Sequence, residues 1–187
     1  TPVTKYDDPA TMELLLEETR ALAENYKGTP GLLLYLLGNE NNYGLFWAGA
    51  ETEDFPEGEE QKQAVGEARG RPMYKLMNKA ARMMKSIDAN APVAICNGDV
   101  LFLDIIAEEC PDVDIYGTNM YRGESFGNAF EVIKQVYGKP VLFTEFGADA
   151  FNAIENQEDQ KSQAYYMVKN WRDIYQNAAG LGKAGNS

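Results

Sequence analysis

An uninterrupted apolar run that ends in two polar residues constrains this chain more than any other feature. The run extends from Leu32 to Leu37, and Gly38 separates it from Asn39 and Glu40. A short unbroken apolar run is typical of a strand in a parallel sheet that helices cover on both faces. In barrels built from such strands, the chemistry lies at the C-terminal ends of the strands. The sequence therefore places Glu40 where a catalytic carboxylate would stand.

A second run has the same pattern later in the chain. Residues Pro140 to Phe146 read PVLFTEF, with Glu145 near the end of the run and Gly147 directly after it. Two strand-end carboxylates can flank a glycosidic bond, one protonating the leaving oxygen and the other attacking the anomeric carbon. A separation of ~5–5.5 Å favours retention and ~6.5–9.5 Å favours inversion of the anomeric configuration. A strand-end glutamate taken alone is more often a helix cap or an ion-pair partner.

Helical periodicity alternates with short apolar runs along the chain. We expect strands at Leu32–Leu37, Pro92–Asn97, Val113–Asn119 and Pro140–Glu145, and helices that begin at Pro9 after an Asp8 cap, at Pro72, near Val100, near Asn128 and near Glu158. This order predicts an α/β fold, a parallel β-sheet with flanking helices. A (β/α)8 TIM barrel has eight strands and ~250 residues, so the chain would form about half of one. We expect residues 1–187 to form a single domain.

One stretch, residues 48–71, has no periodicity and carries many acidic side chains. Its position after the first strand predicts a β-to-α loop over the face that carries the chemistry. The acidic residues do not have the regular D-x-D-x-D-G spacing of a calcium loop. A solvated acidic loop is therefore favoured over a calcium site.

Composition excludes several classes of chemistry and partner. A net charge of -12 argues against nucleic acid and against an anionic membrane surface, and the absence of histidine excludes Ser-His-Asp and Cys-His mechanisms. No apolar run reaches the ~18 residues of a membrane span. The two cysteines, Cys96 and Cys110, are expected to be buried free thiols. We expect no metal and no cofactor, and an extracellular or periplasmic location rather than a cytoplasmic one.

Two short motifs carry a resemblance to a known group of enzymes. GNE at 38–40 and TEFG at 144–147 resemble the acid/base and nucleophile signatures of the retaining (β/α)8 glycoside hydrolases of clan A. The phrase TPGLLLYLLGNE at 29–40 is most similar to the catalytic barrel of glycoside hydrolase family two, the β-galactosidase and β-glucuronidase group. Fungal-type β-1,3-glucanosyltransferases are a related second choice. The resemblance covers nearly the whole chain and implies that its strands are strands four to seven of the barrel.

The resemblance also implies roles for individual residues. Glu40 would be the general acid/base, Glu145 the nucleophile, and Asn39 a partner of the sugar 2-hydroxyl. Tyr121 would orient the nucleophile, although Tyr116 and Asn119 lie close in sequence. We therefore count Asn39, Tyr121 and Asn119 as candidate substrate-binding residues, together with Trp47, which could equally be a buried loop anchor.

These expectations combine into a catalytic segment of a retaining β-glycosidase that acts on an oligosaccharide or β-glycoside by double displacement. The alternatives are a β-glucan transglycosylase, a carbohydrate-binding protein on a degenerate barrel, and a half-barrel assembly module. The parts that the resemblance assigns to strands one to three and eight have no counterpart in the chain. A longer chain or a second copy would have to supply them, and a half barrel alone is expected to be inactive and to self-associate.

Overall fold

Four parallel strands form one sheet in the order β1-β2-β3-β4. The strands are β1 (Tyr35–Leu37), β2 (Val93–Gly98), β3 (Ile115–Met120) and β4 (Val141–Phe146). The register pairs Tyr35 with Val93 and Tyr116 with Val141. This computed structural model describes residues 4–46, 59–181 and 183–187. The predicted fold class is confirmed: the chain is an α/β protein whose parallel sheet matches half of a (β/α)8 barrel.

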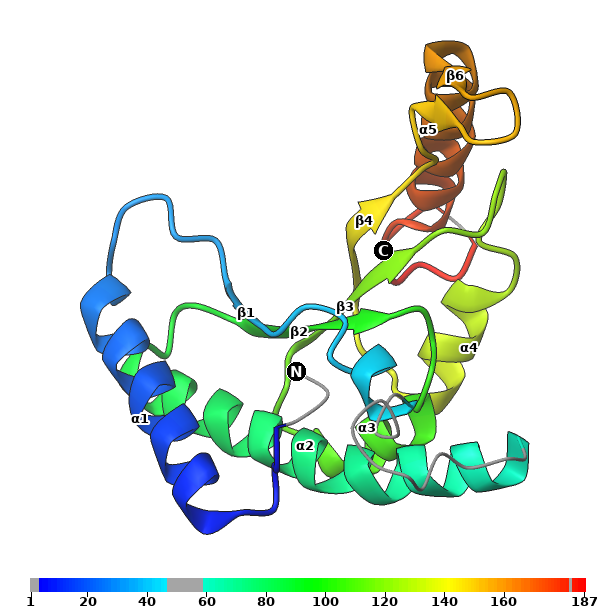
Figure 1. Ribbon diagram of the computed structural model, residues 1–187. Helices are drawn as coiled ribbons and strands as arrows, with labels where there is room; N and C mark the ends of the chain where they lie inside the picture. The colour runs from blue at the N-terminus through cyan, green and yellow to red at the C-terminus, as the bar shows by residue number, and fades with distance from the viewer. Residues whose placement is uncertain (1–3, 47–58, 182) are drawn as a thin grey trace.

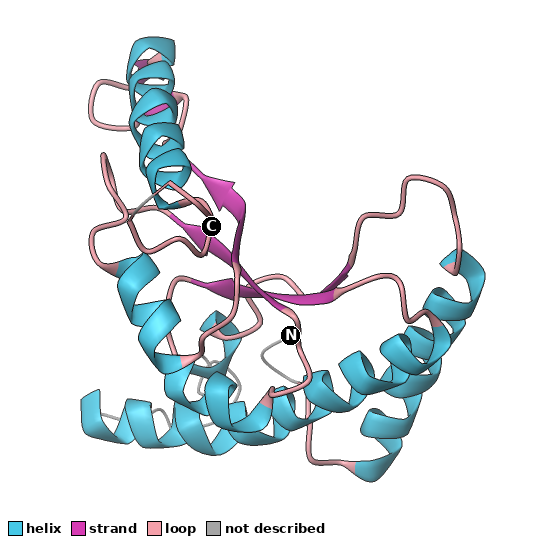
Figure 2. Ribbon diagram, turned by 180° about the vertical axis from the view of Figure 1, so that it is seen from behind, coloured by secondary structure: helices cyan, strands magenta, loops and turns pink. Residues whose placement is uncertain are grey.

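Helices follow the strands in the predicted alternation. They are α1 (Pro9–Tyr26), α2 (Glu59–Ile87), α3 (Leu103–Glu109), α4 (Ala129–Val136) and α5 (Gln160–Asn177). A 3-10 helix, η1 (Tyr43–Phe46), follows β1. Two short strands, β5 (Phe151–Asn152) and β6 (Gln157–Glu158), follow β4 and pair with each other. Helices α1 to α4 lie on one side of the sheet, and α5 projects away from it (Figures 1 and 2). No helix among the described residues is long and apolar enough to cross a membrane.

Helix α1 begins where the sequence predicts. The Asp8 carboxylate accepts a hydrogen bond from the Thr11 backbone N–H at 2.8 Å, and Pro9 occupies the first turn. Proline is suited to this position because the first N–H groups of a helix have no partner within it.

Helix α2 differs from the prediction, because it begins at Glu59 and contains Pro72 in its interior. A proline inside a helix removes one backbone hydrogen bond and costs ~3 kcal/mol. Tertiary packing offsets this cost, since Met73 and Tyr74, which follow Pro72, are buried in one core cluster with Leu45 of η1. Residues 59–71 of the predicted acidic loop are therefore helical. Residues 48–58 lie outside the described part of the chain.

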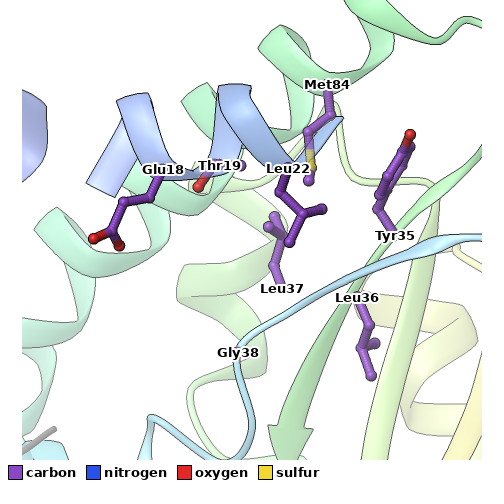
Figure 3. Close-up of a pocket in the computed structure, with 8 residues that line it drawn as sticks. All are labelled: Glu18, Thr19, Leu22, Tyr35, Leu36, Leu37, Gly38 and Met84. Atoms are coloured by element: carbon purple, nitrogen blue, oxygen red, sulfur yellow. The ribbon is translucent and has the colours of Figure 1, made fainter. Parts of the chain in front are cut away.

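Strand β1 is shorter than predicted and only one of its faces is covered. Figure 3 shows Leu37 pointing toward α1 while Leu36 points to the opposite side of the strand, and the same view shows a pocket of mixed polarity between α1 and β1. Leu36 is 44% exposed and Leu33 is 77% exposed. Among the described residues, the core packs against the face of β1 that carries Tyr35 and Leu37, so the face that carries Leu36 is left open. The apolar run correctly predicted a strand but not its exposure.

The main core lies between the sheet and the helices on its covered side. Side chains of β2 and β3, such as Val93, Ile95 and Tyr116, pack there with residues of α2, α3 and α4. Both cysteines are free and buried, as predicted. Apolar side chains of α5 remain largely exposed: Trp171 is 59% and Tyr175 is 61% exposed.

Candidate functional site

Glu40 and Glu145 both lie at the C-terminal edge of the sheet. Glu40 follows β1 by three residues, and Glu145 is the penultimate residue of β4. In β4, Glu145 is the register partner of Asn119, next to an irregularity between Thr118 and Asn119. Because all four strands are parallel, these ends face the same side of the molecule.

The backbone around Glu40 is held against the end of β2. Glu40 has a left-handed backbone conformation (φ 51°), and its N–H donates to the Cys96 carbonyl oxygen at 3.0 Å. The buried Asn42 side chain accepts from the Gly98 N–H at 2.7 Å and donates to the Gly98 carbonyl oxygen at 3.0 Å. A left-handed non-glycine residue is unusual and persists only where surrounding contacts impose it. Asn42 and Cys96 together supply such contacts, so the Glu40 turn has a defined position.

Glu145 accepts a hydrogen bond from a tyrosine of the neighbouring strand end. The Tyr121 hydroxyl donates to Glu145 Oε2 at 2.9 Å, although Tyr121 is 57% exposed. Desolvation, this hydrogen bond and the negative charges of Glu145 and Glu40 raise the pKa of the Tyr121 phenol above its ordinary value. A phenol that stays protonated remains a donor to a carboxylate. Tyr121 is therefore placed to orient Glu145.

The two glutamates share a common environment. Burial is the main reason that the pKa of the Cys96 thiol is raised, and the charges of Glu145 and Glu40 both add to that increase. The same two charges act on Tyr121. Both carboxylates therefore act electrostatically on the same two groups, Cys96 and Tyr121.

A polar floor, which we define as Asn39, Cys96, Asn119 and Thr144, lies at the ends of the four strands. Asn119 Nδ2 donates to Asn39 Oδ1 at 3.1 Å, and the Asn119 oxygen accepts from the Thr144 hydroxyl. The Cys96 thiol lies 3.4 Å from Asn39 Oδ1, 3.3 Å from Asn119 Oδ1 and 3.2 Å from the Thr144 hydroxyl. The floor thus joins all four strand ends by side-chain contacts.

The predicted site residues differ from one another in their exposure to solvent. Asn39, Tyr121 and Glu145 are exposed, and Glu40 is half-buried. Asn119 is 1% exposed and has protein partners for both its amide nitrogen and its oxygen. Trp47 lies outside the described residues.

Several residues of this region were not identified from the sequence. Asn42, Cys96 and Thr144 support the turn or the floor, and Arg122 forms an ion pair with Asp99 beside Tyr121. Their position in the sequence was the one local feature that could have identified them, because each of these residues lies close to the C-terminal end of a predicted strand. Among the described residues, no cluster of acidic or cysteine side chains is arranged to hold a metal ion.

Comparison with solved structures shows which known proteins share the fold of this chain. No protein-family model and no curated protein matches the sequence. Among solved structures, the β-D-glucuronidase from Dictyoglomus thermophilum aligns with a TM-score of 0.61 and 19% identity, over 90% of this chain and 27% of that one.

Two further structures align over similar shares of the chain. The Bacteroides uniformis β-glucuronidase aligns with a TM-score of 0.60 and 13% identity, over 90% of this chain and 20% of that one. The agarase AgWH50C aligns with a TM-score of 0.58 and 12% identity, over 91% of this chain and 31% of that one. The chain thus spans less than a third of the length of each neighbour, and it has a glycoside hydrolase-like fold.

Proposed function

We propose that this chain is the catalytic segment of a retaining β-glycosidase, with Glu145 as nucleophile and Glu40 as general acid/base. The observation that carries the proposal is the 2.9 Å hydrogen bond from the Tyr121 hydroxyl to Glu145. This bond lies at the C-terminal edge of the sheet, where Glu40 also lies. A phenol that donates to a carboxylate holds its oxygens in place, as attack on a carbon atom in a fixed direction requires.

The reaction would proceed by two displacements. A Glu145 oxygen bonds to the anomeric carbon while the bond to the leaving oxygen breaks, and Glu40 transfers its proton to that oxygen. Glu40 then removes a proton from water, whose oxygen attacks the same carbon and releases Glu145 from its ester. The two inversions give net retention, and no electron transfer or cofactor is needed.

The proposed substrate is an oligosaccharide or a simple β-glycoside. The structural neighbours are β-glucuronidases and an agarase, and the present chain has the fold of part of those enzymes. A net charge of -12 favours a neutral sugar over an anionic one. Asn39 is exposed beside Glu40 and would donate its amide to a sugar hydroxyl.

A complete barrel is part of the proposal. Within the described part of the chain, strands β1 and β4 each have a sheet partner on one side only. Such edges carry unpaired backbone groups that readily pair with another strand. We infer that further chain or a second copy closes the barrel around Glu40 and Glu145, and that turnover requires this closure.

A mechanism-based inactivator tests the proposal directly. With the barrel complete, a 2-deoxy-2-fluoro glycoside with a good leaving group should form a stable ester on Glu145, which peptide mass spectrometry would locate. Glu145→Gln should abolish both labelling and turnover. Sugar binding without labelling or hydrolysis would instead support a carbohydrate-binding protein, and labelling of another carboxylate would refute the assignment.

A further inference from the structure

An ion pair joins the segment that carries Tyr121 to the end of β2. The Arg122 guanidinium donates through Nε to one oxygen of Asp99 at 2.9 Å and through Nη2 to the other. Asp99 is the residue directly after β2, and Arg122 follows Tyr121 in the segment after β3. Two-point pairing of this kind fixes direction as well as distance, because both groups are planar.

Other contacts hold the rest of the same segment. Arg122 Nη1 donates to the Phe126 carbonyl oxygen at 3.1 Å. On the other side, Asn170 of α5 donates to the Gly123 carbonyl oxygen at 2.8 Å, and Asp173 of α5 accepts from the Phe126 N–H at 2.9 Å. The segment is therefore held at its start by Arg122 and along its length by α5.

The Tyr121 side chain itself has little support. It is 57% exposed, and its hydrogen bond with Glu145 is made at the solvent-facing side of the sheet. An exposed side chain loses rotational entropy when it makes such a contact. The position of the phenol consequently depends on how firmly its backbone is held, and Arg122 is the adjacent anchor.

We propose that Arg122 is a positioning residue, whose ion pair with Asp99 holds the Tyr121 backbone so that the phenol meets Glu145. Its relevance to catalysis rests on the proposed function, whereas its effect on the contact between Tyr121 and Glu145 can be measured without any turnover. Arg122 acts through Tyr121, and its guanidinium is engaged with Asp99 and with the backbone of Phe126.

The direct test observes the Tyr121 phenol by NMR. Protein labelled with ¹³C at the hydroxyl-bearing ring carbon of tyrosine would be titrated, and Tyr121→Phe would identify the signal. The raised pKa of Tyr121 predicts a titration midpoint above 10.0. Glu145→Gln should lower that midpoint and so define the full effect of the carboxylate.

Arg122→Met should reproduce most of that decrease. A decrease in the Tyr121 midpoint would distinguish loss of positioning from loss of charge. Removing the positive charge of Arg122 would by itself disfavour the phenolate and raise the midpoint. A midpoint equal to or higher than that of the unchanged protein would overturn the proposal, even if the variant melts at a lower temperature. Arg122→Lys, which keeps the charge but not the two-point geometry, should give a smaller decrease and serves if Arg122→Met does not fold.

A matched control separates positioning from general stabilisation. Arg71 also pairs with carboxylates, at 2.6 Å from Glu108 and 3.0 Å from Glu109, between α2 and α3. Arg71→Met should leave the Tyr121 signal unchanged. If it shifts the signal as Arg122→Met does, the effect is not specific to Arg122 and the proposal is wrong.

Kinetics provide the second measurement on the protein with its barrel complete. Arg122→Met should lower kcat on the order of 10²-fold, the size associated with misplacing a reacting group by about 1 Å, with little change in KM. A change in KM alone would contradict positioning and indicate substrate contact. If the unchanged protein shows no turnover and no labelling of Glu145, the proposed function fails, while the NMR result still decides whether Arg122 positions Tyr121.

Discussion

Asn119 donates its side-chain amide to the side-chain oxygen of Asn39 at 3.1 Å, which joins the end of β3 to the segment after β1. Strand β2 lies between these two strands in the sheet. Asn119 is buried, whereas Asn39 is exposed beside Glu40. Because the Asn39 oxygen is the acceptor in this bond, the amide nitrogen of Asn39 remains available as a donor to a ligand. We propose that Asn119 orients Asn39 rather than contacting the sugar itself.

Asn119→Ala should therefore impair the enzyme only on substrates that use Asn39. We expect kcat/KM for an aryl β-glycoside to fall about tenfold, the size of one lost hydrogen bond, and to change little for the matching 2-deoxy glycoside. Asn39→Ala should show the same selectivity if Asn39 binds the 2-hydroxyl as proposed. Equal losses on both substrates would mean that Asn119 supports the site as a whole.

Glu40→Ala should show the behaviour of a missing acid/base. On substrates with good leaving groups the first displacement needs little protonation, so turnover should stall at the glycosyl ester. Added azide should restore release by attacking the anomeric carbon, and NMR of the product should identify a β-glycosyl azide. A variant that azide does not accelerate on any activated substrate would contradict the role of Glu40.

Gly117 occupies a position in β3 where no side chain fits. A Cβ atom there would lie 2.1 Å from the Ile95 backbone oxygen. Gly117→Ala should destabilise the fold by about 3 kcal/mol or more, because a strand backbone cannot move aside as a flexible side chain can. Urea unfolding would measure the loss.

Gly70→Ala provides the control for that substitution. Gly70 is also buried, but a Cβ atom there would lie 3.4 Å from Leu45 Cδ1, and the residue is inside α2. Alanine is favoured over glycine in a helix interior by up to ~1 kcal/mol. We expect unchanged or slightly increased stability, and a loss similar to that of Gly117→Ala would show that closeness to the backbone is not the cause.

Asp114 should contribute to the loss of folding stability at low pH. Burial raises the pKa of its carboxyl, but the 2.6 Å hydrogen bond from Lys85 and the bond from the Val93 N–H outweigh burial and hold that pKa below 3.8. A pKa that is lower in the folded state stabilises the protein above the unfolded value, and this stabilisation is lost as the pH falls through the folded value.

Asp114→Asn should therefore reduce the unfolding free energy at pH 7 more than at pH 3. Urea denaturation at both pH values measures this difference. Asp112→Asn is a useful comparison, because Asp112 lies in the same segment and its carboxylate contacts Arg82 at 3.7 Å and the Asn78 amide. An equal loss at both pH values for Asp114→Asn would assign its effect to packing rather than to ionisation.

The isolated 187-residue chain should self-associate. Its sheet has two edge strands, and Leu36, Trp171 and Tyr175 are among its exposed apolar side chains. Light scattering should show a mass that rises with concentration, and Trp171→Glu with Tyr175→Glu should reduce it. A monomer that turns over an aryl β-glycoside would refute both the association and the need for a closed barrel.

Sequence alone determined the features that depend on neighbours in the chain. The apolar runs predicted the four strands, and Asp8 with Pro9 predicted the start of α1. The positions of Glu40 and Glu145 at strand ends followed from the same pattern. Such signals are readable because strand length, hydrophobic period and helix capping are local properties.

Tertiary structure decided the features that depend on residues far apart in the chain. Helix α2 continues through Pro72 because it packs against η1, and Leu36 of β1 is exposed because none of the elements that the structure describes covers its face of the strand. The bonds from Asn119 to Asn39 and from Arg122 to Asp99 each span more than 20 residues. No local pattern encodes such pairs, since their contact arises only when parallel strands bring their ends to one edge.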